Sequence, residues 1–302
     1  MLTQLITLSC ATIITSSLAA TTDPLRRDGV PVIKPSPGQL QKEFERVLHD
    51  SFPFKPFSAA YVKMAMADPK NWTALGLVTP VKDQGPHGYC GTFGRVGAAE
   101  GQFAKQGGGP LTSFSEEEMV DCIGWDNDQF SYFTDKGFMT SSDYPYNETN
   151  YPDQDPPIPG NPCRYDSKKV VPKTGNGAFT NSTGAAPTED QLVAFIHHNG
   201  PTQTGIASDV FALRAKGCEA TGDCWITKAD CKAFGKKDID HSIILVGYGT
   251  DKVQGDYWIV KNSWSTAFAN GGFINVARGV NCANIACCGN TFTYGDPNKY
   301  YE

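Results

Sequence analysis

The chain has 302 residues, of which 40% are hydrophobic and 19% are charged, a composition typical of an ordinary globular protein. This length is sufficient for two lobes that share one cleft. The formal net charge of -6 argues against nucleic acid or an anionic membrane surface as a partner, because those partners require clustered Lys and Arg.

Residues 1–20 are predicted to be a cleaved secretory signal. Leu2 to Ala20 form an apolar stretch that is short for a bilayer span, and it ends in small residues that a signal peptidase accepts. An uncleaved anchor is the alternative, because no Lys or Arg precedes the apolar run. We expect the secretory pathway, an extracellular or lysosomal/vacuolar destination, and no membrane contact after signal removal.

Residues 21–66 lack the turn-rich strand pattern of the later sequence. Leu40, Phe44 and Leu48 recur at helical spacing and predict one amphipathic helix. The segment is interpreted as a short propeptide, with an N-terminal extension packed on the domain as the alternative. The remaining residues, 67–302, are predicted to form the functional domain.

One cysteine lies where a loop becomes a helix. The segment Asp83 to Phe93 leads into the amphipathic stretch Phe93 to Lys105, so Cys90 is expected at a helix N-terminus. Backbone N–H groups and the positive end of the helix dipole favour a thiolate there. Cys90 is therefore a candidate nucleophile.

The chain from Cys90 to about Cys122 has a helical pattern. Ser115 is followed three residues later by Glu118, which is the spacing of a capping box before an apolar run. The first lobe is therefore predicted to be mainly α-helical.

The later elements differ in character. Residues 151–163 are rich in Pro and Asp and predict a surface loop, whereas residues 188–198 predict a further helix. Residues 242–248, 256–261 and 272–277 are rich in Ile, Val, Tyr and Trp between Gly and Asn, a pattern that favours antiparallel strands. Together these elements predict the α+β class.

Two downstream segments supply partners for the nucleophile. One contains His241, which follows Asp240, and the other contains Asn262 within the run Tyr257 to Trp264. A thiol, a base and a residue that orients the base are the components of nucleophilic catalysis.

The chain has 10 cysteines, which indicates an oxidising compartment. Without Cys10 in the signal and Cys90 as the nucleophile, an even number remains for disulfide bonds. A zinc site is the alternative, but the spacings lack the paired C-x2-C pattern of structural zinc, so no metal site is expected.

Acceptor triplets for N-glycosylation begin at Asn71, Asn147 and Asn181. Asn147 and Asn181 lie in polar sequence rich in Pro and Gly, where surface loops are expected, and are the better candidates.

These motifs resemble those of papain-type cysteine peptidases, and the resemblance runs from about Asn71 to Gly289. It implies a two-lobe fold with a mainly helical left lobe, an antiparallel, β-barrel-like right lobe and an active-site cleft between them. The segments that carry it are Val78 to Gly85, Gly88 to Phe93, Ala99 to Gln102, Phe114 to Cys122, Asp143 to Tyr146, Asp240 to Ser242 and Tyr257 to Trp264.

The resemblance implies thiol-dependent hydrolysis of peptide bonds through an acyl-enzyme intermediate. Cys90 is the expected nucleophile, His241 the acid and base, and Asn262 the residue that orients the imidazole. Gln84 and the Cys90 backbone N–H are expected to form the oxyanion hole.

The resemblance also implies further residues and partners. Trp264, Asp240 and Cys287 are the expected substrate-binding residues, with Cys287 near the floor of the main specificity pocket. The substrate is a peptide or protein, the chain is expected to be a monomer, and no cofactor is expected.

Two disulfide bonds follow from the resemblance, and they join Cys122 to Cys163 and Cys231 to Cys282. The pairing of Cys218, Cys224, Cys287 and Cys288 stays open. Residues 216–237 are predicted to form a disulfide-pinned loop on the leaving-group side of the cleft, with a remote surface loop as the alternative.

The sequence departs from this family around the nucleophile. The family usually has Cys at His87, Ser or Ala at Tyr89 and Trp at Gly91. The Gly-Cys-Asn-Gly-Gly-like segment that pairs with the first of these is also missing after Cys122, which indicates a restructured cleft wall.

Two other functions are therefore considered beside peptide hydrolysis. A catalytically inactive relative would bind peptides or another protein. An acyltransferase of transglutaminase type would use Asp as the third residue, where this chain has Asn262.

Overall fold

The structure is a computed structural model that describes residues 56–123, 129–147, 162–172, 178–184, 188–215, 218–222, 224–235, 237–286 and 289–295. The predicted signal, the predicted helix at Leu40 to Leu48, and Cys287 and Cys288 lie outside these residues.

Six helices and eight strands lie in the described part of the chain, with three short 3-10 helices. The helices are α3 (Ala59–Ala67), α4 (Cys90–Lys105), α5 (Glu116–Ile123), α6 (Gln129–Lys136), α7 (Glu189–Asn199) and α8 (Lys228–Phe234). The strands are β1 (Lys70–Asn71), β2 (Ala178–Gly184), β3 (Thr202–Ile206), β4 (Trp225–Ile226), β5 (His241–Asp251), β6 (Gly255–Lys261), β7 (Phe273–Ala277) and β8 (Gly289–Gly295). The 3-10 helices are η1 (Ser208–Leu213), η2 (Cys218–Ala220) and η3 (Cys282–Asn284).

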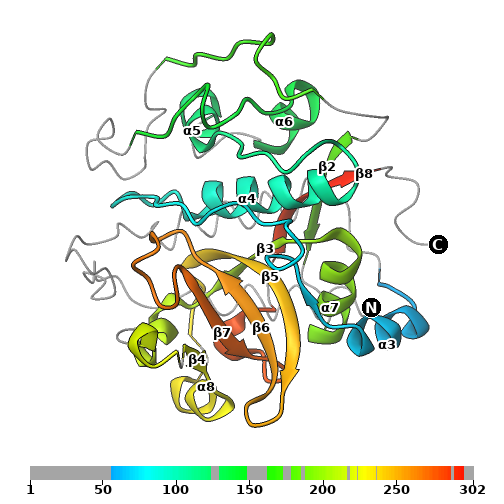
Figure 1. The fold of residues 1–302 in the computed structure, drawn as a ribbon, viewed down its shortest axis with the longest axis vertical. Coiled ribbons are helices and arrows are strands. Elements are labelled where there is room, and N and C mark those ends of the chain that lie inside the picture. The colour runs from blue at the N-terminus through cyan, green and yellow to red at the C-terminus, as the bar shows by residue number, and fades with distance from the viewer. Residues whose placement is uncertain are drawn as a thin grey trace.

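Helix α4 crosses the middle of the molecule and separates two lobes (Figure 1). The helical lobe contains α5 and α6, and the sheet lobe contains β5, β6 and β7 with α7 and α8. The predicted α+β class is confirmed.

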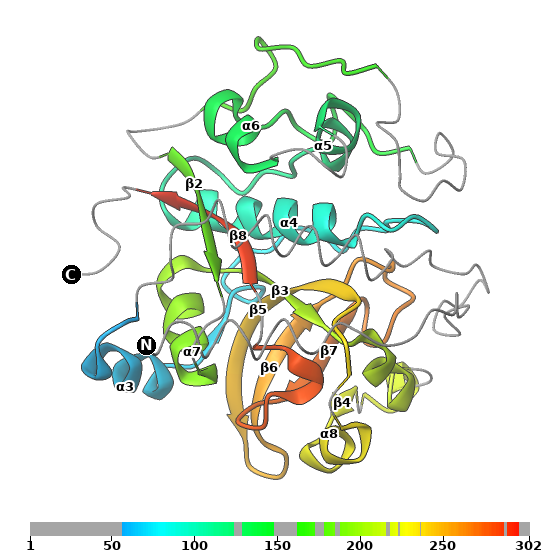
Figure 2. The same ribbon diagram turned by 180° about the vertical axis from the view of Figure 1, so that it is seen from behind.

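The sheet lobe is built on a six-stranded sheet with the order β1-β5-β6-β7-β4, and β3 also pairs with β5. Its pairs are antiparallel as predicted, except that the short strand β4 pairs with β7 in parallel. Strands β2 and β8 form a separate antiparallel pair that crosses α4 on the opposite side of the molecule (Figure 2).

Each lobe has its own apolar core. In the helical lobe Phe114 stacks on Phe138 at 4.7 Å between ring centroids, and Phe133 stacks on the same ring at 4.0 Å. In the sheet lobe Trp258 and Phe211 are fully buried in the larger cluster. Such burial supplies most of the stabilisation of the fold.

The predicted capping box at α5 is half formed. The Glu118 backbone N–H donates to Ser115 Oγ at 2.9 Å, as expected. The Glu118 carboxylate instead accepts from the Met139 backbone N–H at 2.8 Å, because the Ser115 N–H is already used by the Met139 carbonyl.

The predicted boundary between residues 66 and 67 falls within helix α3. The last part of the propeptide-like segment packs on the sheet lobe, where Gln191 of α7 exchanges two hydrogen bonds with the Phe57 backbone at 2.8 and 3.0 Å. Tyr248 of β5 donates to the Ala65 carbonyl at 2.8 Å. These contacts join α3 to α7 and to the sheet.

Helix α4 lies so close to β5 that the contact residues are glycines. A Cβ at Gly94 would lie 2.5 Å from Ser242 Oγ, and a Cβ at Gly97 would meet the end of the Ile244 side chain. The absence of these side chains lets the helix that begins at Cys90 pack directly on the strand that begins at His241.

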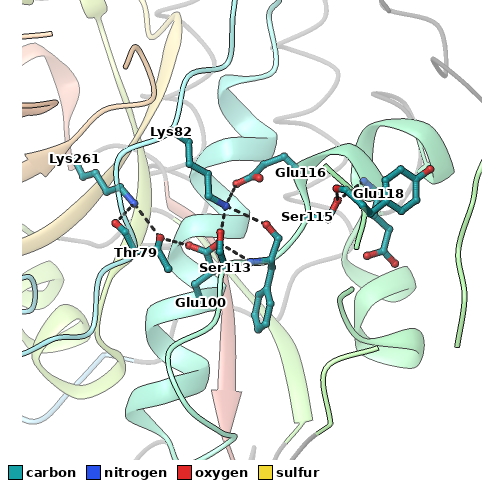
Figure 3. Close-up of polar contacts among 10 residues, drawn as sticks. Thr79, Lys82, Glu100, Ser113, Ser115, Glu116, Glu118 and Lys261 are labelled. Carbon is teal, nitrogen blue, oxygen red and sulfur yellow. Dashed lines mark hydrogen bonds and ion pairs between the residues drawn. The ribbon is translucent and has the colours of Figure 1, made fainter. Parts of the chain in front are cut away.

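A buried network of charged groups joins the two lobes beneath this contact (Figure 3). Lys82 Nζ lies 2.7 Å from the Glu100 carboxylate of α4 and 2.6 Å from the Glu116 carboxylate of α5. Lys261 of β6 donates to the Thr79 carbonyl at 2.9 Å, and the Thr79 hydroxyl donates to Glu100. The network therefore ties three elements to the segment before α4.

The ionisation of this network follows from its burial. Burial alone would lower the pKa of Lys82, but the carboxylates of Glu100 and Glu116 outweigh it and raise the pKa above its ordinary value. Burial lowers the pKa of Lys261 to about 8, although the same carboxylates oppose this.

The substitution Lys82→Met tests the network. It leaves two carboxylates buried without their cation, so we expect the free energy of unfolding to fall by about 3–5 kcal/mol in urea denaturation. Lys70→Met is the matched control, because the two lysine side chains are equally exposed at 21% but the Lys70 partner, Asp68, is 51% exposed. A similar loss in both variants would show that the buried network has no special role.

Candidate active site

Cys90 is the first residue of α4 and is only 4% exposed. It is a free cysteine, and no side chain caps the start of its helix. Backbone N–H groups of Ser242, Gly91 and Cys90 itself act on the thiol in the direction that favours the thiolate.

Burial nevertheless decides the acidity of this thiol. It raises the pKa of Cys90 to about 11, and the charge of Asp240 raises it further, while the three N–H groups act in the opposite direction. Burial of the sulfur therefore outweighs the favourable N–H groups at the helix start.

His241 and Asn262 form a buried hydrogen-bonded pair. His241 Nε2 lies 2.8 Å from Asn262 Oδ1. His241 begins β5 and Asn262 directly follows β6, and the antiparallel pairing of these strands brings the two side chains together. The Asn oxygen only accepts hydrogen bonds, so Nε2 carries the proton and Nδ1 is the basic nitrogen of the neutral ring.

Aromatic side chains surround the imidazole. The Trp264 ring lies 4.5 Å from the His241 ring, centroid to centroid, and Phe211 is perpendicular to both. Trp264 is itself buried. This position suits a side chain that excludes water from the contact between His241 and Asn262.

Asp240 and Gln84 each form hydrogen bonds to other segments of the chain next to the site. The Asp240 carboxylate accepts from the Ser208 backbone N–H at 2.7 Å. Gln84 is fully buried, where its Oε1 accepts from Ser263 Oγ at 2.7 Å and its Nε2 donates to the His87 carbonyl at 2.8 Å. The amide of Gln84 thus connects the loop before Cys90 to the residue after Asn262.

The unusual residues around the nucleophile are packed rather than exposed. His87 and Tyr89 are buried, with ring centroids 5.8 Å apart. Tyr89 packs with Phe93 and Val120, and Gly91 is buried beside it. Burial and nearby acidic groups raise the pKa of Tyr89 well above its ordinary value, so its hydroxyl stays neutral.

The structure joins Cys122 to Cys163, Cys231 to Cys282, and Cys218 to Cys224. The last bond resolves one pairing that the sequence left open, and it closes a short loop around η2. Cys287, expected near the specificity pocket, lies outside the described residues.

The two glycosylation candidates have different settings. Asn147 is exposed, and its backbone N–H donates to Glu117 at 3.2 Å. Asn181 was expected in a loop but lies in strand β2, opposite Phe292. The reason is that β2 pairs with β8, a strand from a distant part of the sequence.

Sequence reasoning missed two residues that contact the site. Ser242 and Gln203 are buried and hydrogen-bonded to each other, next to His241. Ser242 lies within the quoted His motif, but no local pattern identifies its partner on β3.

In the described part of the chain, no group of three or more His, Cys, Asp or Glu side chains could hold a metal ion. None of the helices described is both long and apolar enough to cross a membrane.

The predicted thiol thus lies at the start of α4, and the predicted His–Asn pair is hydrogen-bonded at the start of β5 and just after the end of β6. Residues 66–292 match the family described as "Papain family cysteine protease". The chain belongs to this family, and its two-lobe fold is papain-like.

Relatives and solved structures agree with this assignment. The chain is 32% identical to digestive cysteine proteinase 2 of Homarus americanus over 80% of this chain and 72% of that protein. It is 32% identical to a cathepsin L-like protein of Caenorhabditis elegans over 78% of this chain, which spans 65% of that protein's length. The structure of digestive procathepsin L 3 from Tenebrio molitor larval midgut has a TM-score of 0.60 and 27% identity, and covers 86% of this chain and 83% of its own.

Asn262→Ala tests the role of the His–Asn pair. Loss of this hydrogen bond frees the imidazole, so we expect the rate of Cys90 alkylation by iodoacetamide to fall about tenfold, the effect of about 1–1.5 kcal/mol. Asn199→Ala is the control, because Asn199 is a buried asparagine that bonds the Phe195 carbonyl instead. An unchanged alkylation rate in folded Asn262→Ala would exclude this role.

Proposed function

We propose that this protein hydrolyses peptide bonds as a secreted cysteine endopeptidase. The observation that carries the proposal is the 2.8 Å hydrogen bond between His241 and Asn262, together with the buried free thiol of Cys90 at the start of the helix that packs on the His241 strand. Family membership supports peptides or proteins as the substrate class.

In this proposal the Cys90 sulfur attacks the carbonyl carbon of the scissile bond. His241 gives a proton to the leaving amine as the C–N bond breaks, and the acyl group stays on sulfur as a thioester. His241 then takes a proton from water, which attacks the thioester and breaks the C–S bond. The carboxylic acid leaves, and the Cys90 thiolate is restored beside the protonated His241. Asn262 holds the imidazole in one tautomer throughout.

The oxyanion of each step needs two donors. The Cys90 backbone N–H is one, and Gln84 Nε2, which carries two hydrogens and donates one to the His87 carbonyl, is the other. Donors of this kind contribute about 3 kcal/mol to acyl transfer. The bond from Ser263 fixes the amide orientation that presents Nε2.

The thiolate depends on the charge of His241 in this proposal. Burial holds the pKa of Cys90 at about 11, and the charge of Asp240 adds to this effect. A protonated imidazole beside the sulfur supplies the missing stabilisation, so the thiol and the imidazole titrate as one coupled pair.

The same proposal covers the rest of the chain. Residues 1–20 act as a signal and residues 21–66 as a propeptide-like segment of a zymogen that enters the secretory pathway and acts as a monomer. Trp264, Asp240 and Cys287 contribute to substrate binding, and Asn147 is the better placed glycosylation site because it is exposed.

Hydrolysis of a protein substrate by the processed enzyme tests the proposal. We expect Cys90→Ala to abolish turnover and labelling by a peptidyl epoxide while the thermal midpoint is preserved, because only the nucleophile is lost. A folded, processed wild type that neither cleaves protein nor reacts at Cys90 would instead be a peptide-binding relative without activity.

His241→Ala tests the coupled titration. In the wild type we expect thiolate absorbance in mildly acidic solution, whereas in the variant it should develop only near the pKa of about 11 that burial gives. The measurement is ultraviolet absorbance against pH, with Cys90→Ala subtracted. Equal titration curves for the wild type and His241→Ala would contradict the coupling.

A further inference from the structure

A second buried hydrogen bond lies directly behind the catalytic pair. Gln203 Nε2 of β3 donates to Ser242 Oγ of β5 at 2.7 Å. Both residues are buried, and neither belongs to the expected catalytic set. A buried amide–hydroxyl bond between two strands restricts both side chains, because neither can find water as a substitute partner.

Ser242 connects this bond to both reacting groups. It follows His241 in the chain, and its backbone N–H lowers the pKa of Cys90. In the sheet it lies opposite Gly205, two residues from Gln203. A shift of the Ser242 backbone would therefore change the position of His241 and the effect of this N–H on Cys90 together.

Helix α4 packs closely against the side chains of Ser242 and Gln203. A Cβ at Gly94 would lie 2.5 Å from Ser242 Oγ and 2.8 Å from Gln203 Cγ. Gly94 is one helical turn after Cys90, on the same face of α4. The pair of Gln203 and Ser242 thus fills the space that the missing Gly94 side chain leaves between the nucleophile helix and the histidine strand.

We propose that Gln203 is a positioning residue, which acts through Ser242 to set His241 against Cys90. The inference rests on the proposed function, since it concerns the alignment of the same thiol and imidazole. Gln203 touches neither the substrate nor the reacting atoms in this proposal. It fixes the Ser242 hydroxyl, and Gly94 leaves the room for that contact.

The pH dependence of Cys90 alkylation also depends on the charged and titratable groups near the sulfur. Asp240 precedes His241 and raises the pKa of Cys90, and in the proposed mechanism the charge of His241 stabilises the thiolate. Gln203 and Ser242 are neutral at all relevant pH values. Their substitution therefore changes the titration of Cys90 through geometry and not through an added or lost charge.

The experiment uses the full chain with Gln203→Met, Ser242→Ala and the double variant. Methionine keeps the length of the glutamine side chain but removes the donor. We expect each single variant to lower the rate of Cys90 alkylation about tenfold and to shift its pH profile. The double variant should be no slower than either single one, because both changes break the same bond.

A substitution that adds a side chain at Gly94 gives an independent test. Gly94→Ala should lower the alkylation rate and shift the pH profile, and adding Ser242→Ala should restore part of the rate by removing the colliding Oγ. Gly97→Ala is the matched control on the same helix, since its Cβ meets the flexible end of Ile244. It should lower the thermal midpoint without moving the pH profile.

The outcomes separate this inference from the proposed function. Ultraviolet titration of Cys90 against Cys90→Ala reports the thiol even in a protein that does not hydrolyse peptides. A wild type without hydrolysis overturns the proposed function, whereas the shift in thiol titration still decides the role of Gln203. Folded Gln203→Met and Ser242→Ala proteins with unchanged alkylation profiles, or with fully additive effects, overturn the inference.

Discussion

The close packing of helix α4 on strand β5 is the constraint on which the rest of the site depends. The helix carries Cys90 at its start, the strand carries His241 at its start, and Gly94 lacks the side chain that would collide with Ser242 Oγ between the two elements. In the proposed function this helix and strand, from distant parts of the chain, place the thiol beside the imidazole. Asn262 enters the same region because β6 pairs with β5.

The charged network under this contact has a different role. Its carboxylates come from α4 and α5, and its lysines come from the preceding segment and from β6. Buried ion pairs are weak evidence for net stability, because their desolvation cost rivals their attraction. Their geometry is specific, however, and it fixes how the helical lobe and the sheet lobe meet at α4. The apolar cores of the two lobes supply the stability, and the network supplies the alignment.

The sequence predicted the local features well, and its resemblance to a family supplied the two-lobe fold and two disulfide bonds. The helix after Cys90, the helix over residues 188–198 and the three long strands of the sheet lobe follow from periodicity, so they are found where expected. The bond between Gln203 and Ser242 joins distant segments and depends on a side chain that Gly94 lacks, so no local pattern reveals it. The raised pKa of Cys90 has a related cause, since the helix start is visible in the sequence and the burial of the sulfur is not. Asn181 was misplaced because its partner strand, β8, lies at the other end of the chain.

The central claim is that Cys90 forms a covalent bond to the acyl half of the substrate. Trapping that intermediate tests it most directly, by rapid acid quenching of the processed enzyme with a peptide ester, followed by intact mass and peptide mapping. The account predicts an added acyl mass on Cys90, present during turnover and absent once the substrate is consumed. An enzyme that turns over the ester with no acyl group on Cys90, or with the group on another residue, would contradict it.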